Sequence, residues 1–130
     1  MLSEATLEAI ITQYLDPAAL RAWLGDHLDM EFEAGDDTEC PLARFLTDRA
    51  GVPVYVQNGY ITPENANGPD DMAFAYVPGW AEHFIEQIDE PGEGVLWSAA
   101  EVIALIDAQD YVRHAADGYI HREPGITDEL

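Results

Sequence analysis

The sequence contains no lysine, and its five arginines face twenty-six aspartates and glutamates across 130 residues. The formal net charge is therefore −21. DNA, RNA and anionic membranes would be repelled by such a chain, so we exclude them as direct partners. Because like charges also destabilise a compact chain, an excess of this size indicates selection for something besides folding. The surface that it would attract is a basic one.

Cysteine is almost absent as well, since Cys40 is the only one in the chain. A single cysteine excludes an internal disulfide and a zinc site with several cysteine ligands, and it is typical of a reducing compartment. Long apolar runs are missing too: none approaches the roughly 20 residues of a membrane span, and the acidic N-terminus MLSEATLEAIITQ is unlike a signal peptide. We therefore expect a cytoplasmic protein that does not bind membranes.

Motifs for metal or phosphate chemistry are also lacking. The four histidines share no metal-ligand spacing, and neither HExxH nor CxxC occurs. The stretch after Asp29 resembles a calcium loop only in composition, because Gly35 is its seventh residue rather than its sixth and Cys40 stands where a glutamate is required. PGEG at 91–94 lacks the flanking pattern of a phosphate loop. We therefore predict no cofactor, no metal site and no catalytic residue.

Cys40 keeps an enzymatic alternative open. It precedes Pro41 at an expected helix start, where the helix dipole can lower the pKa of a thiol. His27 or His83 could act as its base, as nucleophilic catalysis would require. An isolated cysteine is more often a small buried residue of the core, however. We expect that buried role, and a protein that is not an enzyme.

The chain does contain enough apolar sequence, 48% of its residues, for one globular domain over 1–130. Apolar residues at helical spacing follow the N-cap candidates Ser3, Asp16 and Ser98, the last of which forms a capping box with Glu101. We expect the first two helices to form a hairpin. The predicted helices cover 4–15, 17–28, 41–50, 79–89 and 99–112.

Alternating apolar residues bounded by turn signals predict short strands. The clearest segment is VPVYVQNGYIT, in which Asn58-Gly59 marks a tight hairpin turn between β-branched and aromatic residues. Strands are expected over 30–34, 52–57, 60–62 and 72–77, and a further edge strand over 119–121. The predicted fold is α+β: a small antiparallel sheet of three to four strands packed with four to five amphipathic helices.

The acidic residues are concentrated in two groups. No cation interrupts the first, and in the second Glu82, Glu86 and Glu90 follow one another at four-residue steps, so they share one helix face. Like charges at this spacing lose about 0.2 to 0.5 kcal/mol per pair. Such rows place charges about 5 to 7 Å apart, which is comparable with phosphates along a nucleic-acid strand. The candidate partner-binding residues are Asp26, Asp29, Glu31, Glu33, Asp36, Asp37, Glu39, Glu82, Glu86, Asp89, Glu90 and Glu93.

These rows predict a small non-enzymatic binding protein of bacterial or phage origin that imitates nucleic acid and blocks a basic nucleic-acid-binding protein. Inhibitors of restriction, CRISPR or DNA-packaging proteins have this physical character, which is an analogy only. Two alternatives stay open: an α+β protein of an acid-rich or salt-adapted proteome, and an antitoxin or immunity protein for a basic toxin. A homodimer is compatible with the sequence. Convergence of the two groups on one side of the fold would favour mimicry, and placement on opposite sides would favour salt adaptation.

Overall fold

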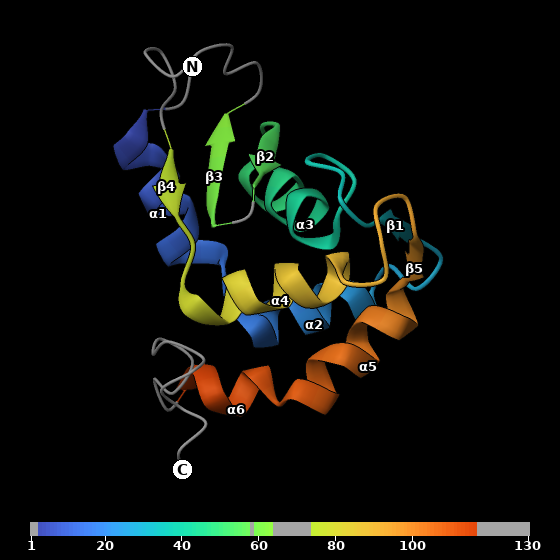
Figure 1. Ribbon diagram of the computed structural model, residues 1–130. Helices are drawn as coiled ribbons and strands as arrows, with labels where there is room; N and C mark the ends of the chain where they lie inside the picture. The colour runs from blue at the N-terminus through green and yellow to red at the C-terminus, as the bar shows by residue number, and fades with distance from the viewer. Residues whose placement is uncertain (1–2, 58, 64–73, 117–130) are drawn as a thin grey trace.

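Helices dominate the computed structural model, which describes residues 3–57, 59–63 and 74–116. They pack with two small antiparallel sheets, which confirms the predicted α+β class (Figure 1). Within these residues the elements in chain order are α1 (Glu4–Tyr14), α2 (Pro17–Gly25), β1 (Glu31–Glu33), α3 (Pro41–Ala50), β2 (Val54–Val56), β3 (Tyr60–Pro63), β4 (Ala75–Tyr76), α4 (Gly79–Asp89), β5 (Leu96–Ser98), α5 (Ala99–Gln109) and α6 (Tyr111–Ala116).

Three helices, α1, α2 and α5, begin after a residue whose side chain accepts a hydrogen bond from a free backbone amide. The Ser3 hydroxyl accepts a hydrogen bond from the first turn of α1, and the Asp16 carboxylate does the same for α2. At the start of α5, Ser98 and Glu101 form both hydrogen bonds of the capping box. Gly51 ends α3 in the left-handed conformation, with φ 77°. The predicted caps at Ser3, Asp16 and Ser98 are therefore confirmed.

The strands form two sheets instead of the single sheet that we expected. Strands β2, β3 and β4 form an antiparallel sheet, and Val56 pairs with Ile61, as the predicted hairpin requires. Strand β1 is not part of it and pairs antiparallel with β5, with Phe32 opposite Trp97. The predicted strands over 72–77 and 119–121 fall partly and wholly outside the described residues.

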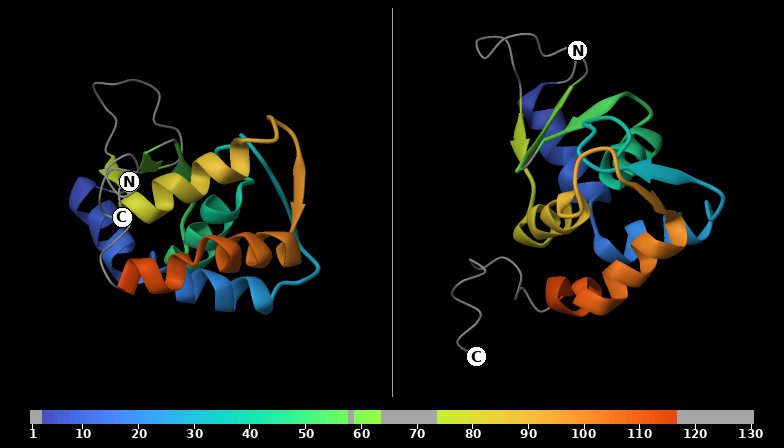
Figure 2. Two further views of the ribbon diagram at one scale, coloured as in Figure 1. Left: turned by 60° about the horizontal axis from the view of Figure 1, so that its bottom comes forward. Right: turned by 45° about the vertical axis from the view of Figure 1, so that its right-hand side comes forward.

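Three helix predictions need correction. The helix expected over 99–112 is divided, because Asp110 adopts a left-handed backbone with φ 57° and separates α5 from α6. The second helix ends at Gly25, three residues earlier than expected. Helices α1 and α2 do not pack as a hairpin: α1 lies against α3, β3 and β4, whereas α2 runs along α5 (Figures 1 and 2).

Helix α4 crosses the middle of the molecule in the view of Figure 1. In Figure 1 the three-stranded sheet, α1 and α3 lie above it, and α5 and α6 lie below it. The apolar faces of all these elements meet in one core, to which Trp23 and Trp80 contribute buried rings. Trp97 is half-buried and its indole N–H donates to the carbonyl of Ile88, 3.1 Å away. Among the described residues, no helix combines the length and the apolar character that crossing a membrane requires.

Candidate functional site

The two acidic groups meet where β1 ends, beside the end of α4. Past β1, the amide of Ala34 donates to the carbonyl of Val95 and the amide of Gly94 donates to the carbonyl of Ala34, both at 2.8 Å. The amide of Gly35 then donates to the Asp89 carboxylate at 2.8 Å. Segments more than fifty residues apart in sequence thus lie together, at the right-hand end of Figure 1. We call residues 26–39 and 82–93 together the acidic region.

Gly35 makes this meeting sterically feasible. Its φ of 77° lies in the left-handed region that residues with a Cβ seldom adopt. A Cβ at this position would also stand 2.8 Å from Cγ of Glu93, closer than real Cβ atoms approach. A glycine is therefore required for the turn after β1 to reach the loop after α4.

Asp36 is an acidic residue with a structural role. Its Oδ1 accepts hydrogen bonds from the amide and hydroxyl of Thr38 and from the amide of Glu39, at 2.8 to 2.9 Å. The Thr38 bonds are the main reason that the pKa of Asp36 lies below its ordinary value. The carboxylate thereby closes the turn that leads into α3.

Three more of the candidate partner-binding residues have partners within the protein. The Gln57 amide donates to Oδ2 of Asp37 at 2.6 Å, and Arg44 forms an ion pair with Glu39 at 2.9 Å. Asp89 accepts the Gly35 amide as described above. With Asp36, these residues contribute to the fold, and Glu39 carries a charge that is already balanced.

The other candidate partner-binding residues accept no hydrogen bond and form no ion pair within the described part of the chain. All are exposed except Glu33, which is half-buried. They spread over the region: Glu93 packs on Gly35, Glu82 lies beside Gly59, and Glu86 is close enough to Tyr111 to raise the pKa of its hydroxyl, which burial raises most. This unpaired set is Asp26, Asp29, Glu31, Glu33, Glu82, Glu86, Glu90 and Glu93.

Acidic side chains elsewhere in the described residues behave differently. Asp48 accepts from the Trp23 indole, and Asp107 forms a two-bond ion pair with Arg21 that lowers the pKa of the carboxyl. Asp16 and Glu101 cap helices, and Asp110 pairs with Arg113. Outside the acidic region, only Glu4 and Glu8 lack such a partner among the described acids. Carboxylates without an internal partner are therefore concentrated in the acidic region.

The described arginines do little to neutralise this region. Arg21 and Arg113 pair with acids of α5 and its end, and the Arg49 guanidinium lies 6.0 Å from the ring centre of Tyr14. Arg44 pairs with a member of the acidic region, Glu39. Arg21 and Arg44 thus pair with acids of the protein itself, whereas Arg49 lies near an aromatic ring.

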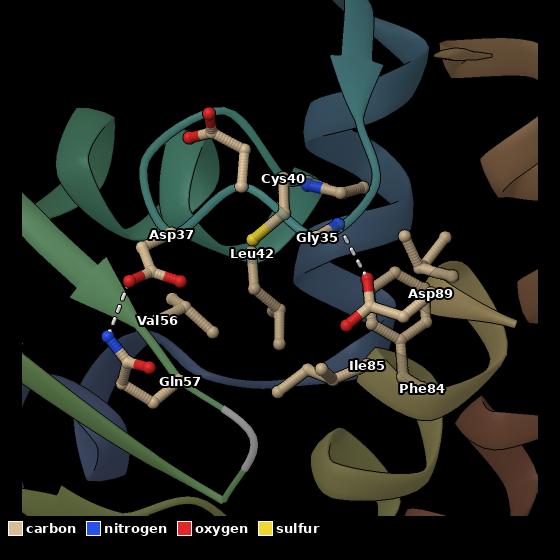
Figure 3. A pocket seen from close by; sticks show the side chains of 12 residues that line it. Gly35, Asp37, Cys40, Leu42, Val56, Gln57, Phe84, Ile85 and Asp89 are labelled. Atoms are coloured by element: carbon tan, nitrogen blue, oxygen red, sulfur yellow. Dashed lines mark hydrogen bonds between the residues drawn. The ribbon is translucent and has the colours of Figure 1, made fainter. Parts of the chain in front are cut away.

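A pocket of about 210 Å³ opens at the meeting point of the two groups, between α3, β2 and α4 (Figure 3). Part of its wall is polar, with Asp36, Asp37, Gln57 and Asp89, and much of the rest is apolar. Sequence reasoning did not predict the pocket, and of its uncharged lining it had considered only Cys40 as a possible functional residue. That remaining lining consists of Gly35, Cys40, Pro41, Leu42, Val56, Phe84, Ile85 and Ile88.

The Cys40 thiol is buried at the wall of this pocket, and its surroundings oppose ionisation. Burial, with the nearby charges of Asp89 and Asp37, raises its pKa to about 12, contrary to the lowering that its position at a helix start suggested. Neither histidine considered as a base is hydrogen-bonded to it: His27 bonds to the Trp23 carbonyl, and His83 to the Tyr111 hydroxyl. The thiol is therefore protonated at neutral pH.

No metal-binding arrangement of histidine, cysteine, aspartate and glutamate occurs within residues 3–57, 59–63 and 74–116. Comparison with known proteins adds no assignment: no family model, curated protein or solved structure matches the chain. The geometry and charge of this molecule are therefore the only grounds for naming the acidic region and its pocket as a candidate site.

Proposed function

We propose that the protein is a non-enzymatic inhibitor that covers the nucleic-acid-binding surface of a basic protein. The carboxylates of the acidic region take the places of phosphates and pair with lysines and arginines of the partner. Occupation of that surface excludes nucleic acid by direct competition. The low cysteine content supports action in the cytoplasm.

The observation that carries this proposal is the uneven use of acidic side chains. Acids outside the acidic region mostly cap helices or bind Arg and Trp side chains, whereas most acids inside it are exposed and have no partner among the described residues. An acid-rich proteome would add carboxylates without regard to position. The concentration of unpaired charge, among the described residues, in two distant segments that contact each other at Gly35 and Asp89 supports a surface kept for a partner.

The net charge determines how the association rate of such a complex depends on salt. A net charge of −21 steers a basic partner toward the protein and raises the association rate at low salt. Screening shortens the reach of this attraction from about 30 Å at 0.01 M salt to about 8 Å at physiological ionic strength. We therefore expect rapid association that weakens clearly over this range.

The test is affinity capture from host extract on the immobilised protein at low salt, followed by elution with increasing salt. We expect basic nucleic-acid-binding proteins to be retained, to be held less tightly as ionic strength rises toward physiological values and to elute above them, and to be released early by added duplex DNA. Retention of no basic protein, or retention that is insensitive to salt and DNA, would contradict the proposal. A matched variant carrying Glu4→Gln and Glu8→Gln, outside the acidic region, should capture the same proteins.

The alternatives give different results in the same experiment and one further measurement. A single partner whose retention duplex DNA does not disturb would indicate an antitoxin or immunity protein. Salt adaptation predicts no specific capture and a free energy of unfolding that keeps rising into molar salt, long after ordinary screening is complete.

A further inference from the structure

The pocket in the acidic region has the size of a single side chain. Its volume is about 210 Å³, whereas pockets for drug-sized ligands measure about 300 to 1,000 Å³. Pockets that each accept one anchoring side chain are typical of the energetic centres of protein interfaces, where arginine is among the enriched residues. The pocket therefore suits one anchor residue of a partner better than a cofactor.

The apolar part of the lining suits a hydrocarbon stem. Leu42, Val56, Phe84 and Ile88 are at most 4% exposed, and Ile85 is 7% exposed, so their positions are held by the core. Long basic side chains bury their methylene groups on such surfaces while the charged head reaches polar groups. A short or wholly polar ligand would leave this apolar wall unused.

The polar part of the lining offers hydrogen-bond acceptors. Asp37 uses Oδ2 for the Gln57 amide, and Asp89 uses Oδ1 for the Gly35 amide. The other oxygen of each carboxylate accepts no hydrogen bond from the described residues. Because the Gln57 amide nitrogen donates to Asp37, its carbonyl oxygen is a third acceptor. Within the described part of the chain, no arginine or histidine lines the pocket, so its carboxylates have no cation among these lining residues.

These acceptors stand on two sides of the apolar surface. Figure 3 shows Asp37 and Gln57 on one side and Asp89 on the other, with Leu42 and Ile85 between them. Both carboxylates also contribute to raising the pKa of the buried Cys40 thiol, so both lie close to this side chain at the pocket wall. A ligand with donors pointing in several directions would use them together.

From this geometry we infer that the pocket receives one arginine side chain of the basic partner, an inference that rests on the proposed function. The guanidinium is planar, permanently charged and carries five N–H donors, so it can bind carboxylates on two sides at once. A lysine ammonium is a compact, strongly hydrated point charge that gives up more hydration on entry. Arginine binding here would anchor the partner, while the surrounding carboxylates steer it.

The test is a titration of the ¹⁵N-labelled protein with N-acetyl-arginine methylamide, followed by NMR. The Gly35 amide and the Gln57 side-chain amide report on the two sides of the pocket. We expect both signals to shift along a saturable curve. The neutral isostere N-acetyl-citrulline methylamide should bind about tenfold more weakly or worse, because charge-assisted hydrogen bonds are lost. Equal binding of the citrulline or lysine analogue, or no saturable shift, would overturn the inference.

Variants with carboxylates neutralised inside or outside the pocket lining test whether the arginine analogue binds in the pocket. Asp37→Asn with Asp89→Asn keeps side-chain shape and the oxygens that accept the Gln57 and Gly35 amides, and it should weaken arginine-analogue binding by about tenfold or more. Glu31→Gln with Glu90→Gln removes the same charge outside the pocket lining and should change this binding less than about threefold. An equal loss in both variants would reduce the effect to net charge and overturn the inference.

The outcomes separate this inference from the proposed function. If basic proteins are captured with the expected salt dependence but the arginine analogue shifts neither signal, the pocket inference fails and the proposed function stands. If the analogue binds as expected but no basic protein is captured, the proposed function fails.

Discussion

At the scale of single residues, the acidic side chains divide into two kinds. Asp36, Asp48 and Asp107 each accept hydrogen bonds from another residue and hold parts of the fold together. Others, such as Glu31 and Glu90, are exposed and have no partner among the described residues. Substitution should therefore lower stability in the first kind and, under the proposed function, weaken partner binding in the second.

Asp36 belongs to the first kind, and its replacement tests that assignment. Asp36→Ala removes the acceptor of three hydrogen bonds and should lower the free energy of unfolding at neutral pH by about 1 kcal/mol. Because folding lowers the pKa of Asp36 below 3.8, the contribution is complete above about pH 4 and is lost as pH falls through the folded value. Urea denaturation at neutral and acid pH measures it.

The matched control for Asp36→Ala is Asp29→Ala, which removes an exposed charge without a partner in the described residues. This variant should leave stability unchanged or raise it slightly, because repulsion is relieved. Similar losses in the two variants, or a difference that widens in acid, would contradict the role given to Asp36.

Cys40 is a second residue whose pKa depends on its surroundings. A pKa of about 12 in place of the ordinary 9.0 leaves about a thousandfold less thiolate near pH 8. Iodoacetamide should therefore alkylate the native protein at least about a thousandfold more slowly than the same protein in urea, as mass spectrometry can follow. Comparable rates in the two states would revive the enzymatic alternative.

At the scale of elements, the acidic region depends on how β1 meets the end of α4. The strand pairing of β1 with β5 and the Gly35–Asp89 hydrogen bond bring the two acidic groups together. The caps at Ser3, Asp16 and Ser98 were predictable because they involve residues three apart. The Gly35–Asp89 contact spans 54 residues, and no local pattern announces it.

The same distinction explains which predictions failed. Strand β5 is only three residues long and ends at Ser98, which also caps α5, so the helix signal concealed the strand. Without β5, strand β1 could only be assigned to the other sheet. The pocket was not predictable either, because Leu42, Gln57 and Ile85 come from separate elements that only the folded chain brings together.

Replacement of Gly35 tests this junction. Gly35→Ala places a Cβ against Glu93 in a left-handed backbone, which should lower the free energy of unfolding by about 1 to 3 kcal/mol. Adding Glu93→Ala removes the clash with the glutamate side chain but not the backbone strain. The double variant should therefore regain part of the lost free energy of unfolding. Thermal and urea unfolding measure both variants. An unchanged stability of Gly35→Ala would contradict the close packing of the two segments.

Substitution in the row of Glu82, Glu86 and Glu90 tests whether these residues lower stability while they promote binding. In Glu86→Lys, the repulsion of residue 86 by Glu82 and by Glu90 becomes attraction. The change should stabilise the protein by about 1 kcal/mol. Capture of basic proteins should weaken. Glu8→Lys on α1, beside Glu4, is the control: it should stabilise by a smaller amount and leave capture intact. Equal effects of the two variants on capture would contradict a specific role for the α4 row.

At the scale of the whole molecule, net charge and its placement have different consequences. The total of −21 sets long-range attraction to any basic surface and repulsion within the chain. Among the described residues, unpaired carboxylates are concentrated in the acidic region and the arginines mostly pair elsewhere, so under the proposed function the placement selects the surface that is bound. The proposed inhibition should therefore depend on particular carboxylates and not on total charge alone.

The most direct test of that claim is displacement of a fluorescent DNA duplex from a captured basic protein at physiological salt. Wild-type protein should displace the duplex, and the Glu4→Gln and Glu8→Gln variant should do so equally well. The variant with Glu31→Gln and Glu90→Gln, which removes the same charge from the acidic region, should need several times more protein for half-displacement. Failure of the wild type to release DNA, or identical curves for the two variants, would contradict the proposed function.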